Sequence, residues 1–316
     1  MINRKESIME DLRTIEKIFR GPEFHMVGDG FRVSQYLPVG INDMKRLSPM
    51  ILLDYHAPHY YEPSSNIRGV GAHPHRGFET VTIAYEGKVE HHDNKGNHGI
   101  IGQGDVQWMT AASGILHKEY HEKEFNNKGG TLHMIQLWVN LPKDKKMTEP
   151  KYQTLLKENM GILKLDNNQG EISIISGEVN GVKGPASTFT KINLYNVNLK
   201  NHGKTILSEP SNFNTGILVL KGEVKINNDT EAKEKDFILF DNVQGNIVVE
   251  SVTEESLFIV LSGEPIDEPI ASHGPFVMNT TEEIYQAYED FRNGKFGILI
   301  IILYRLDKVN RRKKNE

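Results

Sequence analysis

Two short segments of the sequence each carry a pair of potential metal ligands at alternating positions. In GAHPHRGFET, His73 and His75 flank Pro74, and in ILHKEYHE, His117 and Glu119 are again two positions apart. Side chains two apart on a β-strand point to the same side, so each segment would present both of its ligands to one face. A proline within the first pair suits a strand at the edge of a sheet. Together the two pairs predict a mononuclear metal site.

The predicted set of three imidazoles and one carboxylate suits a borderline divalent ion. It resembles the histidine and carboxylate sites in which non-haem Fe(II) keeps open positions for O2 and a substrate oxygen. We therefore expect Fe(II), while Ni²⁺, Mn²⁺, Cu²⁺ and Zn²⁺ also accept such ligands. Glu79 competes with Glu119, because an unbroken strand would place it on the same face as His75. Spacing alone leaves the two carboxylates open.

The other histidines have simpler explanations. The chain has 13 histidines, and a single pair of alternating histidines is more often a surface feature than a metal site. We expect exposure for the three that lie in the hairpin sequence EHHDNKGNH, which are His91, His92 and His98. We expect His121 and His133 to be solvated or packed. The two ligand pairs stand apart because each lies beside an apolar strand of the same predicted domain.

The elements that must position these residues are predicted to be β-strands. Short apolar segments with alternating polar positions are separated by Gly, Asn, Asp and Pro, as in TVTIAYEG, DVQWMTA and HMIQLWVNL. Many short strands at this spacing indicate a sandwich or barrel. The sequence therefore predicts an all-β protein.

The strand pattern occurs twice. TVTIAYEGKVEHHDNKG matches TGILVLKGEVKINNDTE when Gly87 is laid over Gly222, and each copy is followed by an aspartate that opens another strand. Two such copies predict a duplicated β-domain. We place the boundary in the charged segment LPKDKKMTEPKYQTL, which gives a first domain at residues 1–145 and a second at 146–270.

One helix is predicted near the C-terminus, within residues 271–297. Thr280 and Glu283 have the spacing of a capping box. Apolar residues then recur at helical spacing, at Ile284, Ala287, Tyr288 and Phe291. We expect this apolar stripe to pack against a barrel. The segment 298–316 does not continue the pattern, and we expect it to be a disordered tail.

Composition and charge limit the class of function. The formal net charge is −5, so no basic face argues for direct nucleic-acid binding. The chain has 0 cysteines, which excludes disulfides, thiolate catalysis and cysteine-ligated metals. We expect no signal peptide, and the longest apolar run, GILIIILY, is shorter than the roughly 20 residues that span a bilayer. We expect a cytoplasmic, monomeric protein.

Four motifs, in this order, resemble the pirin family of the bicupin superfamily: HPHRGFETVT, GDVQWMTA, GILHKEY and LWVNLP. The resemblance implies two tandem cupin-type β-barrels with one metal ion, usually iron, in the first barrel. The ligands that it implies are His73, His75, His117 and Glu119. This favours Glu119 over Glu79, which would then be structural or support the ligands.

The second copy lacks the histidine motif. Where the first copy has HPHRGFET, the second has EPSNFNTG, without a histidine. We therefore predict that the second barrel is metal-free and that the chain binds one ion.

The resemblance also implies a function, a dioxygenase that opens flavonols such as quercetin with O2. Glu119 would be the catalytic proton acceptor as well as a ligand. Phe78, Trp108, Met109 and Ile115 could line a cavity for a flat aromatic substrate, although we favour the interpretation that they pack in the core. The alternative function is an iron-dependent, redox-sensing regulator that binds a transcription factor or a metabolic enzyme. A metal-stabilised barrel without catalysis is the third interpretation.

Overall fold

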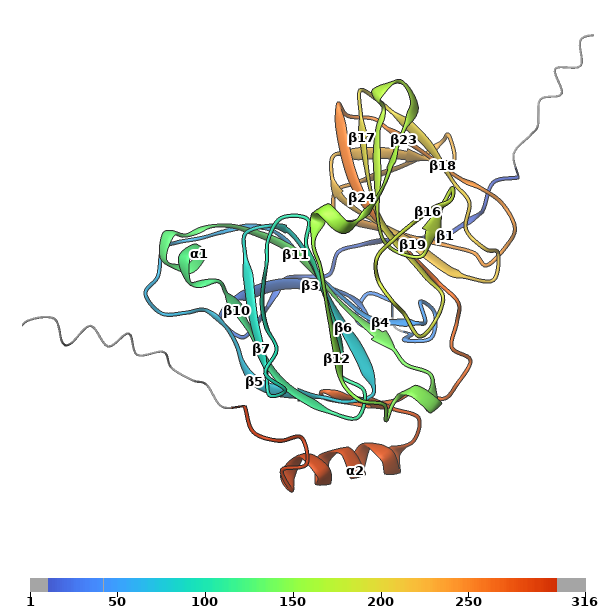
Figure 1. Cartoon of the computed structure of the whole chain (residues 1–316). Coiled ribbons are helices and arrows are strands. Elements are labelled where there is room, and N and C mark those ends of the chain that lie inside the picture. Colours follow the sequence, from blue (N-terminus) through green and yellow to red (C-terminus); the bar gives the residue numbers. More distant parts are fainter. Residues whose placement is uncertain (1–10, 42, 300–316) are drawn as a thin grey trace, which may run out of the picture.

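The computed structural model describes residues 11–41 and 43–299 of the chain. These residues are mainly β-strands in two halves, the first drawn in blue to green and the second in yellow to orange (Figure 1). Each half packs a seven-stranded sheet against a four-stranded sheet, and the pairing of the described strands does not join the two sheets into one closed barrel. The predicted all-β class with two tandem domains is confirmed. Residues 300–316 of the predicted tail lie outside the described range.

All strand pairs in the two sheets of the first half are antiparallel. Its larger sheet has the order β12 (Lys151–Leu155), β9 (Val106–Thr110), β6 (Phe78–Glu86), β11 (Gly130–Asn140), β4 (Met50–Tyr61), β3 (Phe31–Leu37) and β2 (His25–Val27). Its smaller sheet has the order β5 (Gly69–His75), β10 (Ile115–His121), β7 (Val89–Asp93) and β8 (His98–Ile101).

The second half repeats this arrangement. Its larger sheet has the order β1 (Ile15–Arg20), β22 (Asp236–Phe240), β19 (Asn214–Lys221), β24 (Glu255–Gly263), β17 (Ile192–Lys200), β14 (Gly170–Ser176) and β13 (Gly161–Lys164). Its smaller sheet has the order β18 (Lys204–Leu207), β23 (Ile247–Ser251), β20 (Glu223–Ile226) and β21 (Thr230–Lys233). Short elements complete the fold: α1 (Lys123–Lys128), the hairpin β15 (Glu178–Val179) and β16 (Val182–Lys183), and 3₁₀ turns at Lys143–Lys145, Lys157–Asn159 and Asp166–Asn168.

The repeat found in the sequence corresponds to equivalent hairpins. Gly87 joins β6 to β7 and Gly222 joins β19 to β20, with φ of 80° and 76° respectively. Both glycines are in the left-handed region that other residues rarely adopt. The same turn therefore recurs at the same place in each half, and the strands around it can be compared position by position.

The two halves exchange one edge strand each. Strand β1, from the N-terminal part, pairs with β22 of the second half, and β12 pairs with β9 of the first half. A single boundary between residues 145 and 146 does not describe this exchange. Strand β1 lies before the boundary but pairs in the second half, and β12 lies after it but pairs in the first half. The chain therefore crosses between the halves after β1 and again after β12. Neither edge strand could be assigned to its sheet from local sequence.

A shared apolar core fills the space between the halves. In β6, Val81 and Ile83 lie on the face that packs with Trp108 of the first half and with Phe237 and Leu239 of the second. Because side chains alternate along a strand, Thr80 and Thr82 lie on the opposite face of β6, inside the first half. This alternation decides which residues can reach a site inside the sheets.

The C-terminal segment returns to the first half. The hairpin β25 (Ala271–His273) and β26 (Phe276–Met278) leads into helix α2 (Thr281–Arg292), which lies beside the first half (Figure 1). Thr280 and Glu283 form the predicted capping box. Ile284 and Ala287 are buried as predicted, whereas Phe291 is 38% exposed, so the apolar stripe is only partly covered.

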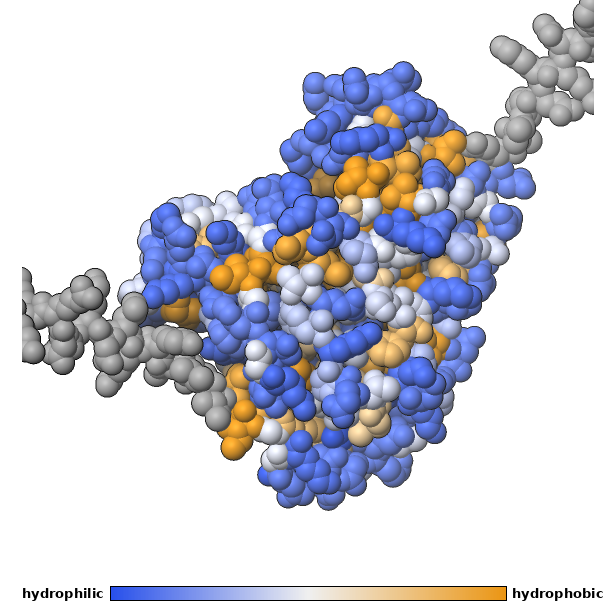
Figure 2. All heavy atoms as spheres, in the orientation of Figure 1, coloured by the Kyte–Doolittle hydropathy of each residue, from blue (hydrophilic) through white to orange (hydrophobic). Residues whose placement is uncertain are grey.

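The surface is mainly hydrophilic on the face seen in Figure 2, with hydrophobic residues in scattered groups. Within residues 11–41 and 43–299, no helix has the length and apolar character needed to cross a membrane.

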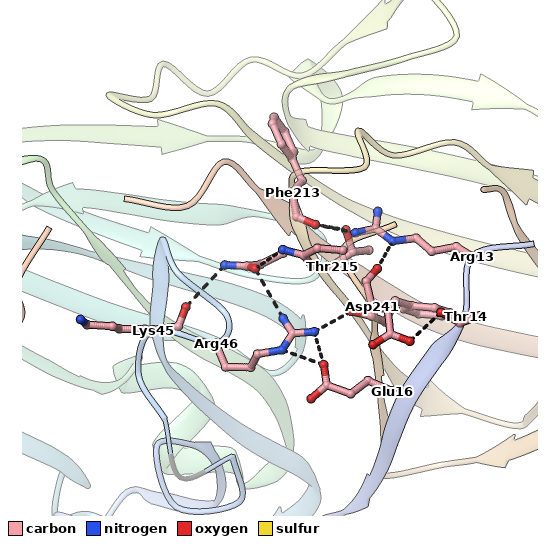
Figure 3. A network of polar contacts seen from close by, with 11 residues as sticks. Arg13, Thr14, Glu16, Lys45, Arg46, Phe213, Thr215 and Asp241 are labelled. Carbon is pink, nitrogen blue, oxygen red and sulfur yellow. Dashed lines mark hydrogen bonds and ion pairs between the residues drawn. The ribbon is translucent and has the colours of Figure 1, made fainter. Parts of the chain in front are cut away.

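A polar network connects the two halves near β1 (Figure 3). Arg46, in the loop before β4, pairs with Glu16 of β1 and donates to the carbonyl oxygen of Phe240 at 2.7 Å. The Arg46–Glu16 pair is partly exposed and contributes little by itself. The hydrogen bond to the backbone of β22 fixes the position of the Arg46 guanidinium against the second half.

Arg13 is the buried part of this network. Its guanidinium donates to three backbone carbonyl oxygens, those of Asp241 at 2.7 Å, Phe213 at 2.6 Å and Pro210 at 3.2 Å. The residue is 0% exposed, so no water can replace these donors. Arg13 therefore holds the segment before β1 against loops of the second half.

We predict that Arg13→Met lowers the free energy of unfolding by about 3 kcal/mol, because buried carbonyl groups lose their donors. The control is Lys17→Met, which removes an exposed cation from the neighbouring strand β1. Chemical denaturation of both variants measures the difference. Equal stability of the two variants would contradict the role given to Arg13.

Candidate metal centre

Three histidines come together where β5 and β10 pair. His117 of β10 lies opposite His73 of β5 in the antiparallel register. The ring centroids are 4.3 Å apart for His73 and His117, 4.8 Å for His73 and His75, and 4.9 Å for His75 and His117. One ligand nitrogen from each ring lies within 4.8 Å of the other two. The two sequence segments that carry the predicted ligands are thus neighbours in the structure.

The protonation of these histidines favours a cation. Burial lowers the pKa of all three imidazoles, and the charge of His73 further lowers the pKa of His75 and His117. At neutral pH the three rings are therefore neutral and keep their lone pairs. His73 can donate from Nδ1 to the carbonyl oxygen of Gly71 at 2.8 Å, which leaves its Nε2 as an acceptor.

Several of these nitrogens have no hydrogen-bond partner among the described residues. His117 is 1% exposed, yet both its Nδ1 and its Nε2 are unpaired, and Nδ1 of the buried His75 is unpaired as well. An unsatisfied buried polar group costs about 1–3 kcal/mol. A divalent ion among the three rings would bind nitrogen lone pairs that have no partner among the described residues. The donor set therefore fits a metal ion.

Glu119 lies next to the three histidines, but its carboxylate is not part of the group that they form. It is on the same face of β10 as His117, and it lines the adjoining cavity. The register between β5 and β10 is shifted between His117 and Glu119, because β5 has one extra residue there. The carboxylate is not among the ligand atoms that lie within 4.8 Å of one another. Burial raises its pKa to about 7, and Thr82 Oγ1 lies 3.3 Å from its Oε1.

Glu79 lies elsewhere. Strand β5 ends at His75 and β6 begins at Phe78, so the unbroken strand that would align Glu79 with His75 does not exist. The break is at Gly77, with φ of 90°, where a Cβ atom would lie 1.9 Å from the carbonyl oxygen of Val277. Glu79 accepts a hydrogen bond from Thr110 at 2.6 Å on the other face of β6.

A cavity of about 320 Å³ opens beside the histidines. Its wall is mostly apolar and comes from β2, β3, β4, β5, β7 and β11. The residues that line it together with the site are Val27, Phe31, Val33, Leu52, Asp54, Val70, Val89, Met134, Gln136, Trp138, Gly274 and Pro275. The indole ring of Trp138 is 5.3 Å from the ring of His75. The volume is at the lower end of the range for small-molecule sites, about 300–1,000 Å³.

Two polar groups in this wall could bind a ligand. Asp54 is buried, its pKa is raised to about 6 by burial, and it accepts a hydrogen bond from Gln35 at 2.9 Å. Gln136 accepts from Thr82 at 2.6 Å and lies opposite Asp54 in the register of β4 and β11. The cavity therefore combines an apolar wall with polar groups on the side of β4 and β11.

None of the four residues suggested as a cavity wall lines the cavity. Trp108 is in the core between the halves, and Met109 and Ile115 pack together beside Tyr152. Phe78 lies behind the wall, with its ring 4.2 Å from that of Trp138. The packing interpretation is therefore the one that the structure supports. The cavity wall could have been predicted from the alternation in HMIQLWVNL, which puts Gln136 and Trp138 on one face of the strand.

The remaining histidines divide between core and surface. The expected exposure of His91 is wrong, because this residue is 1% exposed. It occupies the inward face of β7, opposite Glu119. His92 and His98 are on the outer face of the same sheet and are at least partly exposed. His121 and His133 are packed, in agreement with one of the two alternatives expected for them.

The second half has aliphatic side chains at the positions equivalent to three of the four predicted ligands. Gly87 and Gly222 fix the correspondence of β7 with β20, and strand pairing extends it to the neighbouring strands. The positions equivalent to His73, His117 and Glu119 are aliphatic: Leu207, Ile247 and Val249. His91 is likewise replaced by Ile226. These four aliphatic residues belong to the apolar core of the second half, and none of them has a side-chain atom that could bind a metal.

The C-terminal segment holds the edge strand that carries the histidines. Arg76, directly after β5, pairs with Asp290 of α2 at 2.8 Å and donates to the carbonyl oxygen of Ser113 at 2.7 Å. Its backbone is bridged to Phe276 of β26. Hydrogen bonds from Lys295, Arg76 and Gln286 hold the pKa of Asp290 at about 2. Helix α2 thereby fixes the end of β5 next to His75.

Both halves match known sequence families. A family model described as Pirin matches residues 30–139, and one described as Pirin C-terminal cupin domain matches residues 194–297. A protein of Pseudomonas aeruginosa named "Putative quercetin 2,3-dioxygenase" is 46% identical over 288 residues, which cover 90% of this chain and 99% of that protein.

Solved structures show the same likeness. The crystal structure of a quercetin 2,3-dioxygenase from Acinetobacter baumannii is similar with a TM-score of 0.87 and 41% identity, over 92% of this chain and 100% of that one. The bacterial pirin YhhW from Escherichia coli, crystallised with nickel(II), has a TM-score of 0.60 at 20% identity, over 79% of this chain and 98% of that one. This second likeness concerns the fold alone.

The raised pKa of Glu119 predicts a pH dependence of the metal-free protein. The folded state holds the proton up to about pH 7, whereas the ordinary pKa is 4.5. Stability should therefore fall as pH rises through this interval, because the folded state binds more protons than the unfolded state. Glu119→Gln should lack this contribution. Thermal unfolding of both chelator-treated proteins between pH 4.5 and 8.5 measures it, and a constant difference between them would refute it.

The ion pair of α2 predicts a second effect. Asp290→Ala leaves the buried guanidinium of Arg76 without its carboxylate, which costs about 3–5 kcal/mol. We expect a corresponding loss of unfolding free energy and faster proteolysis within residues 274–297. Glu289→Ala, which changes an exposed carboxylate of the same helix, is the control. If both variants behave alike, α2 does not hold β5 through this pair.

Proposed function

Because this chain belongs to the pirin family of two-domain cupin proteins, we propose that it is a mononuclear metalloprotein and a dioxygenase that opens flavonols such as quercetin with O2. The observation that carries the proposal is the convergence of three neutral imidazoles, two of them buried, beside an apolar cavity. The name of the Pseudomonas aeruginosa relative and the Acinetobacter baumannii structure support the substrate class.

His73, His75 and His117 would hold the ion, with Glu119 as the fourth ligand. Fe(II) is the proposed metal, and Ni²⁺, Mn²⁺, Cu²⁺ or Zn²⁺ suit the same donors. When bound, the ion would supply a Lewis-acidic centre with open positions for O2 and a substrate oxygen. The nickel-bound pirin from Escherichia coli supports the family's capacity for a divalent metal.

The chain's own residues bind and orient the substrate. Trp138, Phe31 and Met134 provide apolar surface for a flat aromatic ring and exclude water from the face of the histidines. Glu119 is the proposed acceptor for the proton of a substrate hydroxyl. Its carboxylate lines the cavity beside the histidines, where a substrate hydroxyl would lie. Asp54 is within the same cavity and would hydrogen-bond a second hydroxyl.

One buried ion per chain is proposed, in the first half, because the second half has aliphatic side chains at three of the four equivalent positions. Leu207, Ile247 and Val249 can neither coordinate a metal nor accept a proton. The second half would then have a structural role, because it packs against the first half through the shared core. Flavonol and O2 would meet only in the first half.

The decisive experiment is oxygen uptake by Fe(II)-loaded protein with quercetin. We expect uptake to match quercetin loss and to fall about a hundredfold or more in His117→Ala, because the ion loses a ligand. His202→Asn is the matched control, since it removes an exposed imidazole in the second half and Asn tolerates the positive φ of 54° at that turn.

Retention of iron separates the possible causes of failure. The wild type should retain one ion after gel filtration, and His117→Ala should lose it while keeping its melting profile as a metal-free protein. Retained iron without uptake would contradict the dioxygenase and favour the iron-dependent regulator. An ion retained by His117→Ala would contradict the site itself.

A further inference from the structure

The outer face of the sheet that carries the histidines has a second group of potential ligands. Strand β7 alternates, with Val89, His91 and Asp93 buried and Glu90 and His92 turned outward. His98 of β8 lies opposite His92, and Tyr120 of β10 lies opposite Glu90. Neighbouring positions of β7, β8 and β10 therefore bring a carboxylate, two imidazoles and a phenol together outside the cavity.

The distances within this group are those of potential ligands to one ion. His98 Nε2 lies 2.8 Å from Glu90 Oε1. One ligand atom each from Glu90, His92 and His98 lies within 4.8 Å of the other two. Ligand atoms that share an ion at about 2.0–2.1 Å lie roughly 3 Å apart. Small side-chain rotations would bring the ligand atoms to this separation. The side chain of His98 is 48% exposed and therefore has room to rotate.

We propose that Glu90, His92 and His98 bind a divalent transition-metal ion, such as Zn²⁺ or Ni²⁺, at a surface site separate from the buried centre. Two imidazole nitrogens favour such ions over Ca²⁺ or Mg²⁺, which prefer oxygen ligands. The hydroxyl of Tyr120 is 2.5 Å from His92 Nδ1. With Nδ1–H donating to the hydroxyl oxygen, this contact orients the ring and leaves the lone pair of His92 Nε2 for the ion.

The charges around the group set its strength. Burial, together with the charges of His98 and Lys118, lowers the pKa of His92, so its lone pair is free at neutral pH. Lys118 lies opposite His92 on β10, and its ammonium is 4.5 Å from the centre of the Tyr120 ring. This neighbouring cation opposes metal binding, whereas the carboxylate of Glu90 favours it. The surface ion should therefore be weaker and more exchangeable than the buried one.

A surface ion would join three strands on the outside of the sheet. Its ligands come from β7 and β8, and the tyrosine that orients His92 comes from β10, which carries His117 and Glu119 on its inner face. The stacked rings of His92 and His98, with centroids 4.1 Å apart and planes at 19°, would separate on binding. The inference concerns binding alone and does not depend on the proposed reaction.

The test is titration of chelator-treated, full-length protein with Zn²⁺ in competition with a chromophoric chelator at pH 7.5. We expect the wild type and the control His202→Asn to bind two ions with different affinities. His98→Ala should lose the weaker ion and keep the tighter one, whereas His117→Ala should lose the tighter ion and keep the weaker one. Lys118→Gln should tighten the weaker site several-fold without changing the tighter one.

Two results would overturn the proposal. One is a wild type that binds a single ion which His117→Ala removes. The other is a second, weaker ion that persists with unchanged affinity in both His92→Ala and His98→Ala. Circular dichroism of these variants, which change partly exposed side chains, establishes that they are folded.

Discussion

The interior of the first half is organised around buried imidazoles that the protein does not satisfy by itself. Within residues 11–41 and 43–299, the enclosed His117 has no hydrogen-bond partner for either nitrogen, and His73 and His75 face it with neutral rings. The second half shows that the same strand scaffold can be filled with aliphatic side chains instead. The polar interior is thus a property of a few positions on β5, β7 and β10, and the free energy that it costs is recovered when a cation binds there.

The edge position of β5 explains why the C-terminal segment returns to the first half. An edge strand interrupted by Pro74 has few ladder hydrogen bonds of its own. Lys146 is buried and donates to the carbonyl oxygens of Gly77 and Val277 and to Asn140 Oδ1, at 2.7, 3.0 and 2.6 Å. These contacts and the ion pair of α2 fix both sides of the turn after His75. The geometry of the cluster therefore depends on residues far from it in sequence.

Strand alternation made much of the site predictable, because it depends on local spacing. It indicated that the histidine pair and the His117–Glu119 pair each share a face, and the resemblance to the pirin family, now confirmed by the family matches, indicated which half carries them. The cavity wall was not predictable in the same way. Trp108 and Trp138 both lie on apolar strands, and only the packing of the two halves decides that one faces the shared core and the other faces the histidines. The exchange of β1 and β12 likewise depends on contacts between the halves.

The central claim is that one ion binds among His73, His75 and His117 in the first half and none in the equivalent place of the second. Anomalous diffraction from crystals of the iron-loaded protein, recorded at the iron absorption edge, tests it directly. The account predicts one dominant peak between β5 and β10, within bonding distance of the three imidazoles. A dominant peak in the second half, or the absence of a peak between β5 and β10 in protein that retains iron, would contradict it.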